Sequence, residues 1–226
     1  MNQLSVTVTD RPRRGYRAKI IASFAVILVV AGSVAVGIRY HSTHQPKGSE
    51  SSGVVPRPEC QLDESTLAQT QTHNFERGRA EGRAADSGVE APDFTAVCGW
   101  GQVEGVDGVD LRRLSYAISR YDGADGIGRA KHTFAFDEEF PTVLGLGNGS
   151  GVAGIGDEAF FSPTGAPGAA TTVGLVVRRG NLILNIGLAG KDQGFLWLTE
   201  MPPAEGKRLT VLVAQDLLRR NLPHAS

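Results

Sequence analysis

The pattern of hydrophobic and polar positions sets one segment apart from the rest of the chain. From Ile20 to Ile38, nineteen residues follow one another without a charge, and no polar face interrupts them. A helix of that length rises about 28 Å, close to the roughly 30 Å of a hydrocarbon core. We therefore predict a transmembrane helix over residues 20–38. A cleaved signal peptide is the alternative, because Ser33-Val34-Ala35 has the pattern of a cleavage site, but signal peptides carry shorter apolar stretches of about 7–15 residues.

The flanks of this segment predict its orientation. Residues 1–19 carry five Lys and Arg against the single acid Asp10. Because basic residues stay on the cytoplasmic side, we expect a cytoplasmic tail at residues 1–19 and an extracytoplasmic location for everything after residue 38. Residues 39–58 are rich in Ser, Gly, Pro and His, which predicts a flexible linker. The predicted localisation is a single-pass membrane protein with its N-terminus inside.

Residues 59–226 have the length and the patterning of one globular domain. Helical spacing of apolar residues predicts helices over 62–73, over 126–140 and from Pro203 onward, the last with a stripe of Leu209, Leu212, Val213 and Leu217. β-rich runs predict strands over 94–103, 111–121, 171–178 and 182–188, and re-entry into the sheet at 159–161. Residues 76–92 are polar and small, which is typical of an exposed loop. Strands joined in hairpins predict an α+β fold, with an antiparallel sheet of about five strands and helices packed on it.

The net charge of the chain differs in sign before and after the start of this domain. Residues 1–58 hold eight Lys and Arg against two Asp and Glu, a net charge of +6, while residues 59–226 hold fifteen against twenty-two, a net charge of −7. An acidic domain lacks the basic stripe that nucleic-acid binding needs, so we expect no nucleic-acid partner.

The two cysteines, Cys60 and Cys98, both fall in the predicted outer domain. An even number of cysteines in an oxidising compartment favours a disulfide, and two unpaired buried thiols are the alternative. A metal site is not indicated, because two cysteines without clustered histidines form an incomplete ligand set.

Candidate chemistry is sparse. Gly149 to Gly154 has the G-x-G-x-x-G spacing of a dinucleotide loop, but no Asp or Glu occurs from residue 159 to residue 191, where the ribose partner belongs. Ser150 lacks the flanking glycines of a nucleophile elbow. The histidines His73, His132 and His224 are isolated in sequence. We therefore assign no catalytic, cofactor or metal-binding residue.

The glycine-rich run from Gly145 to Gly156 remains a candidate binding loop, with Asn148, Asp157 and Glu158 as its polar groups. Adjacent residues of a strand point to opposite faces, so Asp157 and Glu158 are not expected to act together as acid and base.

Four short motifs carry a resemblance when taken in order: Cys60, Cys98-Gly99-Trp100, GIGDEA at 154–159 and RRGN at 178–181. This set resembles a family of small actinobacterial envelope proteins, many of them lipoproteins, with a domain of unknown function. The resemblance implies an envelope location and a Cys–Cys bridge, and it supplies no catalytic residues. No cysteine closely follows the hydrophobic run, so a transmembrane anchor would replace the lipid.

These observations predict a non-catalytic, membrane-anchored domain that binds an envelope protein or a small ligand. Two alternatives stay open, namely an envelope hydrolase or transferase with dispersed catalytic residues, and an accessory or regulatory subunit of an envelope complex.

Overall fold

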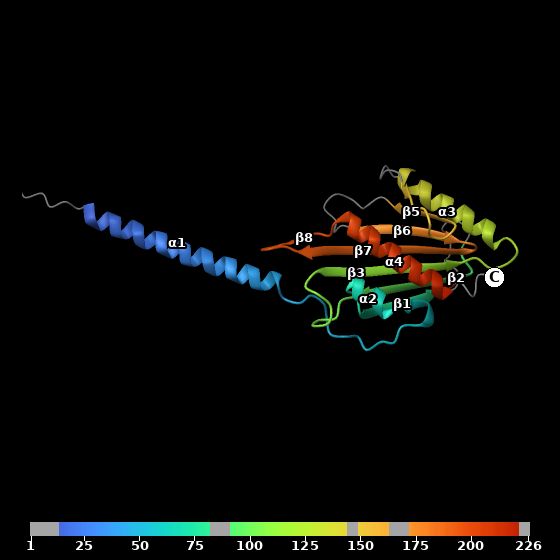
Figure 1. Cartoon of the computed structure of the whole chain (residues 1–226), viewed down its shortest axis with the longest axis horizontal. Coiled ribbons are helices and arrows are strands. Elements are labelled where there is room, and N and C mark those ends of the chain that lie inside the picture. The colour runs from blue at the N-terminus through green and yellow to red at the C-terminus, as the bar shows by residue number, and fades with distance from the viewer. Residues whose placement is uncertain (1–13, 82–90, 144–148, 163–171, 222–226) are drawn as a thin grey trace, which may run out of the picture. The chain divides into compact units, whose positions relative to one another are not determined.

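The computed structural model describes residues 14–81, 91–143, 149–162 and 172–221, and the chain divides into two units, residues 1–42 and 43–226. The helix α1 (Arg14–Thr43), which includes the predicted membrane segment, lies in the first unit except for its last residue, Thr43 (Figure 1). Among the described residues, no helix is both long and apolar enough to cross a membrane. Residues 39–43, the start of the predicted linker, continue α1 as helix.

The second unit is built on a single antiparallel sheet of eight strands (Figure 1). The strands are β1 (Asn74–Glu81), β2 (Phe94–Gly101), β3 (Leu111–Arg120), β4 (Ser150–Gly151), β5 (Glu158–Ser162), β6 (Thr172–Arg179), β7 (Leu182–Gln193) and β8 (Leu198–Glu200). Their order is β1-β2-β3-β7-β6-β5-β4, and β8 pairs with the end of β7. The predicted α+β fold with an antiparallel sheet is confirmed, but the predicted strand number of about five is too low.

The three strands that were not predicted were missed for two physical reasons. β1 occupies the first part of the predicted loop 76–92, and it is polar because it lies at the edge of the sheet, where charged side chains discourage pairing with other chains. β4 and β8 have only two and three residues. Elements that short contain no measurable alternation, so the sequence could not indicate them.

Three helices cover the sheet from two sides. α2 (Glu64–Thr70) and α4 (Pro203–Asn221) share the first side, while α3 (Gly126–Val143) contacts β5, β6 and β7. The alternation within β6 separates the two sides, because Leu175 and Val177 join the core under α4 and Val176 joins the smaller cluster under α3. α2 is shorter than predicted, and Gln71, in the left-handed region at φ 54°, follows its last residue.

The segment after Thr43 is attached to the domain over part of its length. Ser49 forms an isolated parallel bridge with Val103, and the side-chain amide of Asn74 donates to Ser49 Oγ at 2.8 Å and to the carbonyl of Glu50 at 3.2 Å. Ser52 in turn donates its hydroxyl to the carbonyl of Phe75. Within the predicted flexible linker, residues 39–58, residues 49–52 therefore run along the domain.

The predicted disulfide between Cys60 and Cys98 is present and joins the short turn η1 (Pro58–Cys60) to β2. Both cysteines are buried in the main core, where Phe75 and Trp100 pack edge to face with ring centroids 5.0 Å apart.

Replacing both cysteines, as Cys60→Ala with Cys98→Ala, is expected to lower the free energy of unfolding. The sequence separation is 38 residues, for which the loop-entropy relation gives about 4 kcal/mol. Urea unfolding of the oxidised protein, the reduced protein and the double variant measures this. Equal midpoints for all three would contradict a stabilising bridge.

Candidate functional site

The side of the sheet that faces away from α4 is open over β2 and β3 in the described part of the chain. Residues that alternate with the core positions reach solvent here, including Val97 on β2, which is 45% exposed, and Ser115 on β3. α3 covers this side only where it contacts β5, β6 and β7. An uncovered sheet face of this kind is where a partner or ligand can pack without disturbing the core.

Small residues line up across this open face. The register aligns one residue from each of five neighbouring strands, namely Gly99, Ser115, Gly187, Gly174 and Ser162. A Cβ atom on Gly174 would lie 2.4 Å from the hydroxyl oxygen of Ser162, and one on Gly187 would lie 3.3 Å from that of Ser115. A larger residue at Gly174 would therefore have to displace the hydroxyl of Ser162, and the row forms a trough between taller neighbouring side chains.

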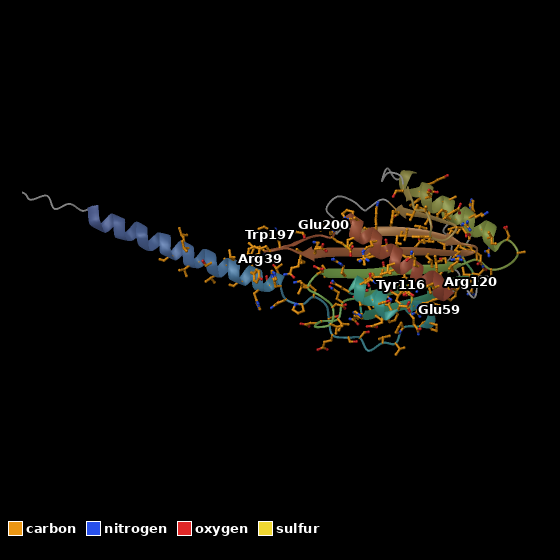
Figure 2. All side chains as sticks on the ribbon, viewed as in Figure 1. Arg39, Glu59, Tyr116, Arg120, Trp197 and Glu200 are labelled. Carbon is orange, nitrogen blue, oxygen red and sulfur yellow. A yellow bond between two sulfur atoms is a disulfide. The ribbon has the colours of Figure 1, made fainter. Side chains whose placement is uncertain are left out.

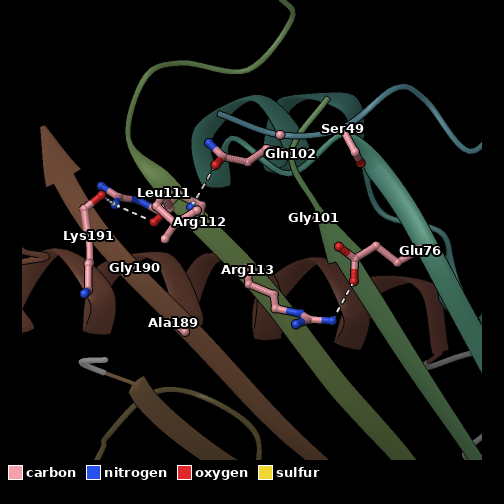
Figure 3. A pocket seen from close by; sticks show the side chains of 11 residues that line it. Ser49, Glu76, Gly101, Gln102, Leu111, Arg112, Arg113, Ala189, Gly190 and Lys191 are labelled. Atoms are coloured by element: carbon pink, nitrogen blue, oxygen red, sulfur yellow. Dashed lines mark hydrogen bonds and ion pairs between the residues drawn. The ribbon is translucent and has the colours of Figure 1, made fainter. Parts of the chain in front are cut away.

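Two depressions adjoin along the central strands β3 and β7. One, of about 330 Å³, is lined by the pairs Ser115–Gly187 and Ala117–Asn185 and by Val97. The other, of about 450 Å³, begins at the next pair of the same register, Arg113–Ala189, and continues to Leu111 and Lys191 (Figure 3). The two depressions are adjacent, because these pairs are consecutive on one face, and we refer to them together as the β3–β7 groove.

The ends of the groove differ in charge. At one end Arg113 donates to the carboxylate of Glu76 at 2.8 Å, and this pair is exposed (Figure 3). At the other end Asp137 of α3 lies beside Asn185, where desolvation by burial raises the pKa of the carboxyl and a hydrogen bond from Asn185 opposes that rise in part. Between the ends the lining residues are uncharged. Such a surface can bind by packing and hydrogen bonding.

Asp157 and Glu158, predicted as binding-loop residues, hold the buried Arg178 instead. Arg178 is 4% exposed, and it donates from Nη1 to Asp157 at 2.9 Å and from Nε to Glu158 at 2.6 Å. Asp157 also accepts the backbone N–H of Gly180 in the β6–β7 turn at 2.8 Å. The expectation that the two carboxylates diverge is wrong, because Asp157 precedes β5 and its backbone does not continue the strand. Asn148 lies outside the described residues.

Part of the predicted loop lines a different cavity. Gly154, Ile155 and Gly156 border about 550 Å³, together with Arg179 and Arg219. Neither Asp157 nor Glu158 lines this cavity. The acidic pair and the glycines of the GIGDEA motif therefore face different surroundings.

His73 is not isolated in space, although it is isolated in sequence. Its Nδ1 lies 2.6 Å from Oδ1 of the buried Asp107, and its Nε2 lies 3.2 Å from Glu64. Asp107 also accepts the backbone N–H groups of His73 and Val103. No histidine lines any of the three cavities described above. The carboxylates on both nitrogens fix the ring in place, and a histidine that abstracts a proton needs one nitrogen facing the substrate.

Comparison of the chain with family models, with curated proteins and with solved structures finds no match. The resemblance to actinobacterial envelope proteins therefore stays a prediction.

Asp157→Ala is expected to destabilise the protein by about 1–3 kcal/mol, because it leaves a buried guanidinium with one carboxylate fewer and an unpaired N–H in the turn. The Gly180 N–H and then Arg178 lower the pKa of Asp157 from its ordinary 3.8. The stabilisation from Asp157 is therefore present above pH 3.8 and is lost as the pH falls through the lower folded value. Chemical unfolding at neutral pH and at acidic pH measures both effects.

Glu76→Ala is the matched control, because its partner Arg113 is 72% exposed and such pairs contribute about 0–1 kcal/mol. Equal losses in the two variants would show that Arg178 does not depend on Asp157.

Asp137→Asn is expected to raise the free energy of unfolding at neutral pH, because it removes a charge that burial disfavours. The native state takes up the proton of Asp137 more readily than the unfolded chain, so wild-type stability falls as pH rises from 3.8 through the raised folded value. Below pH 3.8 the gain in the free energy of unfolding from Asp137→Asn should disappear, because the carboxyl is then protonated in both states. Glu138→Gln, an exposed position on the same helix, controls for the loss of charge, and an equal gain there would contradict the prediction.

Proposed function

We propose that this protein is a non-catalytic binding domain of the cell envelope, anchored by a single membrane helix at residues 20–38. The proposal places residues 1–19 inside and the domain outside the cytoplasmic membrane. The uncharged segment, the basic tail before it and the Cys60–Cys98 disulfide support it, because disulfides persist in oxidising compartments.

The β3–β7 groove is the proposed binding surface, and it is the observation that carries the proposal. From Leu111 to Ala117 the groove is about 20 Å long at roughly 3.3 Å per residue. Val97 on β2 and Val176 on β6 flank it three strand spacings apart, which is about 14 Å. A helix with its side chains has a diameter of roughly 10–12 Å.

The occupant that these dimensions fit is a helix of another envelope protein. The first side of the sheet already binds a helix in the same manner, since α4 packs on β6 and β7 through Leu209, Val213 and Leu217. A helix with small or apolar residues on one side would cover Val97 and the trough. The polar ends of the groove, at Glu76–Arg113 and at Asp137, would fix its direction.

An envelope hydrolase or transferase is the second candidate, and the His73–Asp107 pair is the observation in its favour. A buried carboxylate that orients an imidazole is part of many hydrolytic sites. Here the other ring nitrogen faces Glu64, and no hydroxyl or thiol contacts the ring in any hydrogen bond described for these residues. We therefore rank this function below binding.

Site-specific photocrosslinking in cells tests the binding surface. A photoreactive amino acid at Ala117 in the groove is expected to capture a discrete envelope protein, identified by mass spectrometry. The same probe at Ala68, an exposed alanine on α2 on the other side of the sheet, is the matched control.

Adding Ser115→Trp to the Ala117 probe should fill the trough and reduce capture by about tenfold or more, equivalent to a loss of roughly 1.4 kcal/mol. Position 115 is exposed on a strand, where tryptophan is well tolerated. Equal capture from Ala68, or capture that Ser115→Trp leaves unchanged, would refute the groove as the binding surface.

A further inference from the structure

The hairpin of β7 and β8 presents two aromatic side chains at its tip. β7 continues past its last pairing with β3, at Lys191, and turns at Gly194 into β8. Phe195 is 72% exposed and Trp197 is 60% exposed, and Figure 2 shows Trp197 at the end of the hairpin. Two large aromatic side chains exposed in one short turn are unusual on a soluble surface and mark an interaction site.

The base of this hairpin is held firmly. Arg112, which is buried, forms an ion pair with Asp192 and donates from Nη1 to the carbonyl of Lys191 at 2.8 Å. The backbone N–H of Gln193 donates to Asp110 at 2.7 Å, and the N–H of Gly194 closes the turn onto the carbonyl of Trp197 at 3.0 Å. The aromatic side chains are therefore carried on a structured support and not on a loose loop.

The chain enters the domain at this same tip. Thr43, the first residue of the domain unit, donates its hydroxyl to the carbonyl of Leu196 at 3.0 Å. Ile38, the end of the proposed membrane segment, is only five residues earlier. Five residues span at most about 18 Å when extended, and about 8 Å when helical. One headgroup layer is roughly 5–8 Å thick.

Charged residues of both signs lie near the tip. Lys191 on β7 lies opposite the exposed Glu200 on β8. Residues 191–200 hold one base, Lys191, against the two acids Asp192 and Glu200, so the hairpin has no excess of positive charge to attract anionic lipid. The chemistry that remains is that of the aromatic rings, which prefer the boundary between headgroups and acyl chains.

We propose that the tip of the β7–β8 hairpin inserts Trp197 and Phe195 into the interface of the membrane in which the protein is anchored. This inference rests on the proposed membrane anchor. It adds a second point of membrane contact, which would fix the height and the tilt of the domain. A flexible tether alone would leave both undetermined.

Tryptophan fluorescence of the full-length chain in phosphatidylcholine vesicles tests this. The chain has two tryptophans, and Trp100 is buried at 3% exposure. Trp197 is therefore the exposed reporter. In vesicles whose acyl chains are brominated near the headgroup, most of the Trp197 emission should be lost, while aqueous iodide should quench it little. Trp197→Phe should abolish the response to brominated lipid.

A matched control moves the reporter to the far end of the sheet. Ala124 is exposed just beyond β3, at the end of the β3–β7 pair opposite to Lys191, about 30 Å away along the strands. Ala124→Trp in the Trp197→Phe background should be quenched by iodide and not by brominated lipid.

Alkaline extraction of the same vesicles separates the two proposals. If the chain resists extraction but Trp197 is quenched by iodide and not by lipid, the tip inference is wrong and the anchor stands. Shielding of Trp197 from both quenchers would indicate a protein contact and would equally overturn the inference. If alkali releases the chain, the anchor is wrong, and this inference is wrong with it.

Discussion

The pairing of β3 with β7 is the constraint on which the rest of the domain depends. Ten consecutive residue pairs, from Leu111–Lys191 to Arg120–Leu182, join the strands before α3 to those after it. Because side chains alternate along a strand, this register sends Leu114, Tyr116 and Ile118 into the core, and it leaves Arg113, Ser115 and Ala117 on the other side. A slip by one residue would exchange the two sets. The main core and the β3–β7 groove are therefore two consequences of one register.

Arg178 is a second constraint on the sheet, and it lies near the start of β7, beside the β6–β7 turn. A guanidinium buried to this degree is costly unless it is paired and hydrogen-bonded, and here Glu158 accepts from Nε while Asp157 and the carbonyl of Gly180 accept from Nη1. Gly156, at φ 62°, precedes the acidic pair, and a Cβ atom there would lie 2.5 Å from the carbonyl oxygen of Arg178. The GIGDEA and RRGN motifs are thus the two halves of one clamp that attaches β5 to the β6–β7 turn. The sequence indicated a turn into the sheet, and it could not indicate the buried arginine that the turn surrounds.

The sequence predicted those elements whose pattern is contained in a short stretch of the chain. The helix α4, the β6–β7 hairpin and α3 each carry their pattern within about twenty residues, and all three are present. The disulfide was predicted from a count of two cysteines. β1 was missed because an edge strand needs no apolar alternation.

The groove was missed for a different reason. Gly99, Ser115, Gly187, Gly174 and Ser162 come from five strands, and only the register places them in one row. Single small residues in separate strands form no recognisable motif in the sequence, so the groove could not be predicted. The contact of His73 with Asp107 crosses 34 positions and was invisible for the same reason.

The two proposed surfaces are connected through the segment that follows Thr43. That segment begins at the hairpin tip, and Gly48 and Ser49 then line the end of the groove that also contains Arg113 and Lys191. Ser49 is held there by its bridge to Val103, and Gly48, at φ 120°, passes so close to Gln102 that a Cβ atom would lie 2.6 Å from its carbonyl oxygen. A protein that occupies the groove would therefore contact the chain six residues after it leaves the tip.

The short distance between the hairpin tip and the groove restricts the position of a protein bound in the groove. If the tip lies in the membrane interface, the Arg113 end of the groove is its membrane-proximal end and the Asp137 end is its distal end, since β3 and β7 run between them. The groove, which begins at Lys191, then lies about three residues from the turn at Gly194, which is roughly 10 Å along the strand. A partner helix that enters at this end would emerge from the same membrane, so the geometry favours a membrane-anchored partner over one that diffuses freely in the envelope.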